Sequence, residues 1–403
     1  MIKSILVIAP RPTLARELQN RAHERGRDWS MHHVRSGVEG LVFLRQRLCD
    51  AVICEQDAGN ISGVKFLDEM QTRHPQMLRF LVANLADSRA AATLVGCTHQ
   101  ILPAGAQVHS VEYALDRAFQ LAVWLPSDHA MKLMGSIKNI PSPPSTYFQM
   151  VKELQSPLSS MDSVGQIISR DPAVSAKLLQ LANSSLLGLQ LQVSSIPEAL
   201  MYLGMETTKS LVLLAHAFSH FEGKASPGMP VDALWKHSFK VGRRAQLIGE
   251  SEQCSSDEAG TIFTADLLHD FGKLLLAANL PSKVRESIVL AKEKGLPMWE
   301  AERQVFGTDH AEVGGCLLGI WGLPRSILES VALHHQPVQF EEMDGRTVAI
   351  VHCADVITSS FAPSVPDVTA ARLDLAFLGA AGFGDRFEIW DGSCREEWAA
   401  RAA

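Results

Sequence analysis

The chain has 403 residues, of which 46% are hydrophobic and 20% are charged, and its formal net charge is −7 at pH 7. This composition is ordinary for a folded globular protein and excludes a disordered chain. The net negative charge disfavours binding to nucleic acid or to an anionic lipid surface. The length exceeds what one hydrophobic core usually serves, so we expect two main domains.

The cysteines and the apolar runs indicate a cellular location. Seven cysteines are scattered without a C-x-x-C pair, which is typical of a reducing cytoplasm. The longest apolar runs, such as 210–218, are far shorter than the roughly 20 residues that a membrane-spanning helix needs. The first ten residues lack the leader and cleavage site of an export signal. We therefore expect a cytoplasmic protein that binds neither membrane nor nucleic acid.

Short apolar segments alternate with amphipathic helical patterns over residues 1–125. Five such pairs predict a parallel sheet with helices on both faces, arranged in a flavodoxin-like α/β fold. The segments expected to form strands are 4–10, 30–36, 50–55, 78–84 and 98–103, and those expected to form helices are 13–26, 37–48, 62–75, 87–96 and 110–125.

The segments 50–67 and 74–102 resemble the third to fifth units of response-regulator receiver domains, the phosphorylated modules of two-component systems. Receiver chemistry needs an acidic pair that holds Mg²⁺, an acceptor aspartate, a hydroxyl residue and a lysine. The matched positions here are Ala9 and Pro10, Glu55, Ala83 and Ala104. The resemblance therefore implies a degenerate receiver-like domain that accepts no phosphoryl group by the usual route. Glu55, at the phosphoacceptor position, either imitates a phosphorylated acceptor or reflects drift.

Residues 126–144 are proline-rich and include the sequence PSPP, which is typical of a linker. Helical periodicity follows over residues 145–385, where alternating β-branched runs are missing, so we predict an all-α domain. One continuous helix is expected over 259–280. Residues 386–403 are expected to form a charged helical C-terminal tail.

Several motifs between residues 135 and 340 closely resemble those of HDOD domains. They are DPAVSAKLLQLANSS, VSSIPEALMYLG, LWKHSFKVG, LLHDFGKL, GTDHAEVGGCLLGIWGLP and LHHQP. HDOD domains are helical output modules of bacterial signalling proteins, related to HD-superfamily phosphohydrolases and usually regarded as having lost catalysis. The resemblance implies a signalling adaptor whose output domain binds a signalling protein or a nucleotide. A homodimer is compatible with the receiver-like domain.

The resemblance also implies a set of candidate metal ligands in the order found in metal-dependent HD hydrolases. They are His237, His269, Asp270, His310, His334, His335 and Asp355. Imidazole and carboxylate ligands that converge from several helices can hold one or two divalent ions, here iron, manganese, magnesium or zinc. Lys273 lies one helical turn after His269 and Asp270, so the three side chains are expected to crowd one helical surface near a phosphate.

Two features of the related cyclic di-GMP phosphodiesterases are missing. Those enzymes have a glutamate on the helix of the first histidine, and Ala233 occupies that position here. The segment QPVQFEEMDGRT stands where they have a glycine-tyrosine-proline loop. Two hypotheses stay open. In the first, the domain does not catalyse a reaction and retained ligands preserve a packed hydrogen-bond network. In the second, the chain is a metal-dependent phosphohydrolase or cyclic-dinucleotide phosphodiesterase in which Asp270 and Lys273 act in catalysis.

Overall fold

The chain is described here by a computed structural model. Its contacts divide into two units, which are Met1–Ser142 with Cys316–Gly322 and Pro143–Gly315 with Leu323–Ala403. In the described ranges no helix combines the length and apolar character needed to cross a bilayer. The structure describes residues 2–74, 77–83, 98, 100–124, 128–137, 145–154, 156, 159–170, 174–175, 178–179, 193–221, 231–321, 323–337, 345–361 and 368–402.

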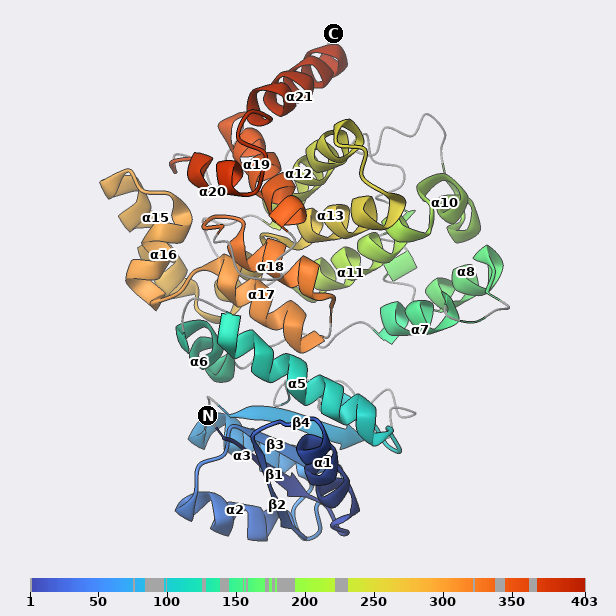
Figure 1. Ribbon diagram of the computed structural model, residues 1–403, viewed down its shortest axis with the longest axis vertical. Coiled ribbons are helices and arrows are strands. Elements are labelled where there is room, and N and C mark those ends of the chain that lie inside the picture. The colour runs from blue at the N-terminus through green and yellow to red at the C-terminus, as the bar shows by residue number, and fades with distance from the viewer. Residues whose placement is uncertain are drawn as a thin grey trace. The chain divides into compact units, whose positions relative to one another are not determined.

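The first unit is built on a five-stranded parallel sheet with the order β2-β1-β3-β4-β5 (Figure 1). This order confirms the predicted flavodoxin-like fold. The strands are β1 (Lys3–Ile8), β2 (Trp29–Val34), β3 (Ala51–Glu55), β4 (Leu78–Ala83) and β5 (Gln100–Pro103). The helices are α1 (Thr13–Glu24), α2 (Gly37–Gln46), α3 (Gly63–Arg73), α5 (Val108–Trp124) and α6 (Asp128–Ser136).

Both faces of this sheet are buried, because helices cover each of them. Ile5 and Val7 of β1 pack with residues of α1 and α5. Leu6 and Ile8 point to the other face and pack with residues of α2 and α3. A central parallel strand that is buried on both sides reads as a continuous apolar run, which is why β1 could be recognised in the sequence. The helix expected over 87–96 lies outside the described residues.

The second unit is helical, which confirms the predicted all-α domain. Among its described residues, the β-structure consists of one isolated bridge between Pro297 and Thr369. Its helices are α7 (Ser145–Leu154), α8 (Met161–Ser169), α10 (Ile196–Leu203), α11 (Met205–Phe221), α12 (Val231–Ser251), α13 (Ser256–Leu268), α14 (Phe271–Asn279), α15 (Pro281–Lys294), α16 (Met298–Phe306), α17 (His310–Trp321), α18 (Arg325–Leu333), α19 (Gly345–Phe361), α20 (Leu375–Ala380) and α21 (Phe387–Ala402).

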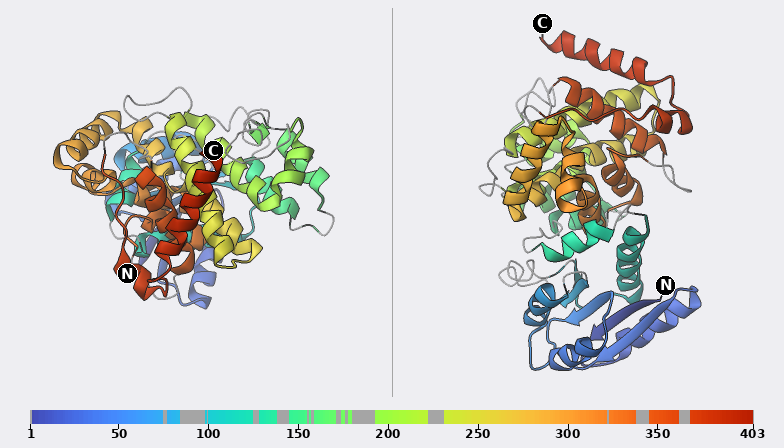
Figure 2. Two further views of the ribbon diagram at one scale, coloured as in Figure 1. Left: turned by 90° about the horizontal axis from the view of Figure 1, so that it is seen from above. Right: turned by 90° about the vertical axis from the view of Figure 1, so that its left-hand side faces the viewer.

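Helix α19 lies in the core of this unit, since every residue from Thr347 to Ser359 is buried. Helices α12, α13 and α18 pack against it. The C-terminal residues form α21, drawn in red in Figure 2, which packs against α12 and α19. Trp390 anchors this helix, because its ring is buried and its indole N–H donates to Glu252 at 2.8 Å. A packed core of helices therefore holds α12, α13, α18 and α19 in fixed positions, and the candidate site is built from the interiors of α12 and α19 and from the ends of α13 and α18.

A buried carboxylate joins α1 to α5 in the first unit. Glu112 is 1% exposed, and it accepts hydrogen bonds from Arg21, at 2.6 Å, and from Arg27. Burial raises the pKa of Glu112, but the arginines outweigh this effect and hold the pKa below its usual value. The ionised carboxylate therefore stabilises the folded state.

We expect Glu112→Gln to lower the free energy of unfolding by about 1–3 kcal/mol, because it leaves the arginines imperfectly paired. Since the pKa is lower in the folded state, the stabilisation is present above about pH 4.3 and is lost as the pH falls further. Urea unfolding at pH 7 and pH 3.5 measures both effects. Glu24→Gln, at an exposed site on α1, is the control. Equal stability of the two variants at pH 7 would contradict the prediction.

Candidate metal centre

Seven imidazole and carboxylate side chains meet where helices of the second unit converge. Two groups form, each with ligand atoms within 4.8 Å of one another. All the ligands come from helix interiors or helix ends, so a rigid scaffold positions them. They are His237 of α12, His269 and Asp270 between α13 and α14, His310 at the start of α17, His334 and His335 after α18, and Asp355 of α19.

The predicted continuous helix over 259–280 is wrong. Helix α13 ends at Leu268 and α14 begins at Phe271, with Asp270 at φ −93° and ψ 7° between them. The break turns the chain so that the carboxylate of Asp270 points into the cluster. His269, Asp270 and Lys273 therefore do not share one continuous helical surface. Lys273, in the first turn of α14, donates to Asp270 Oδ2 at 2.7 Å.

Gly272 allows this break to pack directly against the start of α17. A Cβ atom at Gly272 would lie 1.9 Å from the carbonyl oxygen of His310 and 2.9 Å from the backbone nitrogen of Gly314. Any other residue would therefore push the two helices apart. The close backbone approach brings His310 to Asp270, and their Nε2 and Oδ1 atoms lie 3.2 Å apart.

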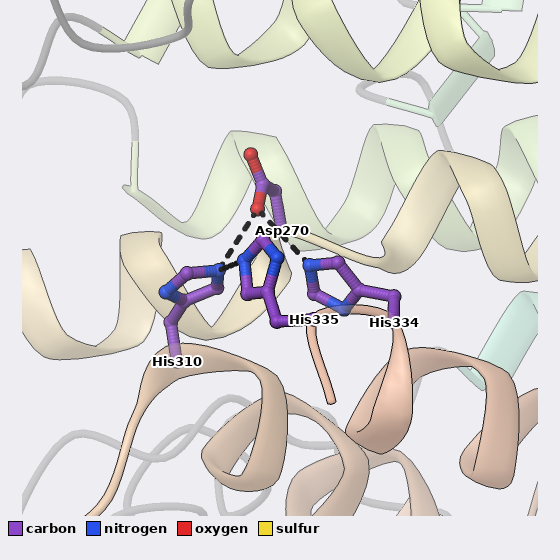
Figure 3. Close-up of side chains that lie close together, drawn as sticks. All are labelled: Asp270, His310, His334 and His335. Carbon is purple, nitrogen blue, oxygen red and sulfur yellow. Dashed lines mark hydrogen bonds and ion pairs between the residues drawn. The ribbon is translucent and has the colours of Figure 1, made fainter. Parts of the chain in front are cut away.

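The first ligand group surrounds Asp270 Oδ1 (Figure 3). His310 Nε2 lies 3.2 Å from this oxygen and His334 Nε2 lies 3.9 Å from it. His335 Nε2 lies 2.9 Å from His310 Nε2. Four donor atoms from three chain segments thus converge on one small volume.

The second ligand group consists of His237, His269 and Asp355. His237 Nε2 lies 3.1 Å from Asp355 Oδ1, and His269 Nε2 lies 3.8 Å from the same oxygen. The other oxygen of Asp270, Oδ2, lies 3.5 Å from His269 Nε2. Asp270 therefore presents one carboxylate oxygen to each group.

Among the described residues, His269 and His334 each have an Nε2 that faces the cluster without a hydrogen-bond partner. His269 Nδ1 lies 2.6 Å from the carbonyl oxygen of Asp266, and His334 Nδ1 lies 2.7 Å from that of Val331. A carbonyl oxygen only accepts, so each Nδ1 carries the proton and each Nε2 is left with its lone pair. Both Nε2 atoms are buried and unpartnered. A metal ion would supply the missing partner.

A carboxylate that the sequence analysis missed orients His310. Glu302 of α16 is fully buried, and its Oε2 lies 2.5 Å from His310 Nδ1 and accepts from the His310 backbone N–H at 2.9 Å. Burial lowers the pKa of His310, but Glu302 reverses this effect and raises the pKa to about 9. The carboxylate fixes the ring with Nε2 toward Asp270, and a cation that binds Nε2 must displace the proton there.

Apart from His310, which must lose its proton, the ligands of the cluster are in ionisation states that suit a divalent cation. Burial raises the pKa of Asp270, but Lys273 and neighbouring histidines outweigh it and hold the pKa well below its usual range. Burial likewise raises the pKa of Asp355, which His237 and His269 bring well below its usual range. Burial lowers the pKa of His334 and His335. Ionised carboxylates and neutral imidazoles are the forms that bind metal.

Two other features could have been suspected from sequence patterns. Glu302 lies on the buried side of α16 with Met298 and Ala301, and a charge on an apolar helix face signals a buried partner. His352 precedes Asp355 by one helical turn, and its Nδ1 lies 2.6 Å from the carbonyl oxygen of His334.

Of the missing phosphodiesterase features, Ala233 lies in the first turn of α12, whereas 338–344 of the substituted loop lie outside the described residues.

Residues 140–337 match the family model of the HDOD domain. The chain contains an HDOD domain. This finding confirms the resemblance inferred from the motifs. The HDOD match includes six of the seven cluster residues, and Asp355 lies beyond it.

Solved structures share the fold of this chain. An HDOD domain protein of unknown function from Geobacter sulfurreducens is 24% identical, with a TM-score of 0.53 over 66% of this chain and 87% of that one. A protein from Shewanella amazonensis SB2B, described as a candidate phosphohydrolase, is 20% identical, with a TM-score of 0.50 over 70% of this chain and 93% of that one. At these identities the likeness shows the fold alone.

A relative from Treponema pallidum (strain Nichols), an uncharacterised protein, is 23% identical over 208 residues. The matched segment covers 51% of this chain and 39% of that relative. The chain thus matches less than half of the length of this relative.

The receiver-like positions lie together at the carboxyl edge of the sheet. Glu55 ends β3 and Ala83 ends β4, while Ala9 and Pro10 follow β1 and Ala104 follows β5. Burial and then the charge of Asp57 raise the pKa of Glu55. Alanine and proline side chains offer no oxygen to Mg²⁺ and no ammonium to a phosphoryl group.

We expect Glu302→Gln to weaken metal binding to the HDOD domain about 10–100-fold. The carboxamide orients the His310 ring less strongly, and the substitution removes the negative charge of the carboxylate. Competition with a chelating dye, in protein purified without a histidine tag, measures the affinity. Glu293→Gln, at an exposed position of α15, is the matched control. Equal affinities of the two variants would show that Glu302 does not tune the centre.

We expect acetyl phosphate and Mg²⁺ to leave the receiver-like unit unlabelled, because the Mg²⁺ ligands and the lysine are missing. Intact-protein mass spectrometry checks this outcome, with a functional receiver protein as the positive control. Stoichiometric labelling that disappears in Glu55→Gln would overturn it.

Proposed function

We propose that this chain is a cytoplasmic signalling adaptor whose HDOD domain holds divalent metal in a closed centre and passes a signal to a partner protein. The receiver-like unit would act without phosphorylation. One observation carries the proposal. The described residues assemble a full set of metal ligands, but the adjoining cavity, lined by Lys273 and Asp355, has a volume of only about 30 Å³.

The donor set supports the metal part of this proposal. His237, His269 and Asp355 would hold one ion, and Asp270 with His310, His334 and His335 would hold another. Mixed imidazole and carboxylate ligands suit manganese, iron or zinc. The unpartnered Nε2 atoms of His269 and His334 argue against a hydrogen-bonded packing network alone, because buried polar atoms without partners destabilise a fold.

The size of the cavity supports the adaptor part. A volume of about 30 Å³ has room for about two water molecules, whereas ligand sites usually measure about 300–1,000 Å³. A cyclic dinucleotide does not fit beside the metal ligands in this conformation. A signalling protein that recognises the outer surface of the domain is the partner class that the closed centre favours.

A second candidate function is a metal-dependent phosphodiesterase or phosphohydrolase, with Asp270 and Lys273 in catalysis. The observation that favours it is the complete ligand set, since one carboxylate faces both groups and Lys273 lines the cavity. A divalent ion held there would supply positive charge that polarises a phosphate and activates water. This function requires that the cavity open.

We expect protein purified without a histidine tag to carry transition metal, and Asp270→Ala to lose it, because the carboxylate serves both ligand groups. Elemental analysis by mass spectrometry measures the metal content. His23→Ala removes an exposed histidine of α1 and serves as the control. Wild-type protein with less than about 0.1 equivalent of metal after growth with manganese and iron would exclude the metal part of the proposal.

The same preparations decide between the two functions. The adaptor hypothesis predicts no turnover of cyclic di-GMP or of a chromogenic phosphodiester under Mn²⁺ or Fe²⁺. Turnover that is abolished in Asp270→Ala and retained in His23→Ala would instead establish the enzyme.

A further inference from the structure

A short extended segment forms one wall of the cavity beside the metal centre. We call residues 368–374, which lead into α20, the strap. Val368–Ala371 of the strap line the cavity together with Lys273 and Asp355 of the centre. The remaining walls come from Ser359 of α19 and from 297–299 at the start of α16. The strap and α16 therefore limit the space next to the ligands.

Contacts at both ends of the strap hold it in place. Val368 is buried, and Thr369 pairs with Pro297 in a parallel β-bridge. Because proline has no N–H, Thr369 must supply both its own N–H and its own C=O to this bridge. Arg372 lies 3.9 Å from Glu300, but its side chain is largely exposed, so this ion pair adds little stability.

His352 connects the strap to a candidate metal ligand. Its Nδ1 lies 2.6 Å from the carbonyl oxygen of His334, so Nδ1 carries the proton and donates. Its Nε2 is then an acceptor, and the backbone N–H of Asp374 donates to it at 3.0 Å. The ring is completely buried. Displacing the strap would leave a buried imidazole nitrogen without its partner and would loosen the contact that fixes the His334 backbone.

We propose that the strap is a closing element of the metal centre and that His352 is a positioning residue that couples the strap to His334. This inference rests on the proposed function, because it assigns the strap to the same centre. Among the described residues, one bridge, one buried side chain, one exposed ion pair and one hydrogen bond from Asp374 hold the strap. Such a segment opens locally without unfolding the domain. Metal and small anions then reach the ligands only in the open state.

The direct test measures how fast metal leaves the full-length protein. Manganese-loaded protein is mixed with excess chelator, and metal release is followed by stopped flow. Thr369→Pro removes the backbone N–H of the bridge and is expected to speed release about tenfold, which corresponds to about 1.4 kcal/mol of docking free energy. Thr369→Val keeps the N–H and is the matched control.

Three further variants test whether the effect comes from the strap and not from a folding defect. Val368→Asp places a charge at the buried end of the strap and is expected to speed release, whereas Leu375→Asp changes an exposed residue just after the strap and is expected to have no effect. Arg372→Ala is expected to have a small effect, because its ion pair is exposed. Circular dichroism and thermal melting verify that each variant is folded.

A second readout needs no bound metal. In metal-free protein, diethyl pyrocarbonate modifies accessible imidazoles, and mass spectrometry measures the rate at His335. Thr369→Pro and Val368→Asp are expected to accelerate this modification, while Thr369→Val and Leu375→Asp match wild type.

The two readouts separate failure of the strap from failure of the proposed function. Folded strap variants with wild-type rates of metal release and of modification would overturn the proposal that the strap closes the centre. Wild-type protein that binds no metal would overturn the proposed metal centre, and the modification rates alone would then decide whether the strap closes the cluster.

Discussion

The carboxylate of Asp270 is the feature on which the helical unit depends. Its Oδ2 accepts from Lys273 at 2.7 Å and faces His269, while its Oδ1 lies 3.2 Å from His310 and faces His334. Three chain segments, at the break between α13 and α14, the start of α17 and the end of α18, are therefore organised around one buried negative charge. Such a charge is tolerated in a low-dielectric interior only when surrounding groups compensate it, so the positions of α14, α17 and the end of α18 are tied to one another through this residue.

The sequence was sufficient to predict the fold class and the residues that the structure gathers into the candidate metal centre. Apolar runs such as 4–10 predict buried parallel strands, because a strand covered on both faces has no polar side. The ligands could be named because their order along the chain is that of a known family. The break between α13 and α14 could not be predicted, since residues 259–280 have continuous helical character and only the close contact of Gly272 with His310 requires the chain to turn.

Contacts between residues distant in the chain account for what the sequence did not reveal. Glu302 precedes His310 by eight residues on a different helix, and no spacing rule relates them. The bond from Asp374 to His352 and the bridge from Thr369 to Pro297 likewise join separate elements. These contacts depend on packing, which fixes distances that local propensity does not encode. They are also the contacts that orient a candidate ligand or restrict the cavity, so these features were less accessible from the sequence than the candidate ligands themselves.

The closed centre and the altered receiver-like unit fit one kind of signalling. On the proposed function, a receiver-like unit without Mg²⁺ ligands would have no covalent switch, so its regulation would come from binding. On the proposed function, an ion in the centre would add its binding free energy to the stability of the helical unit, because the ligands come from helices that separate on unfolding. Metal supply would then change the stability and stiffness of a domain that presents a surface to a partner. A centre that keeps its ligands but is too small for a nucleotide suits this role better than it suits catalysis.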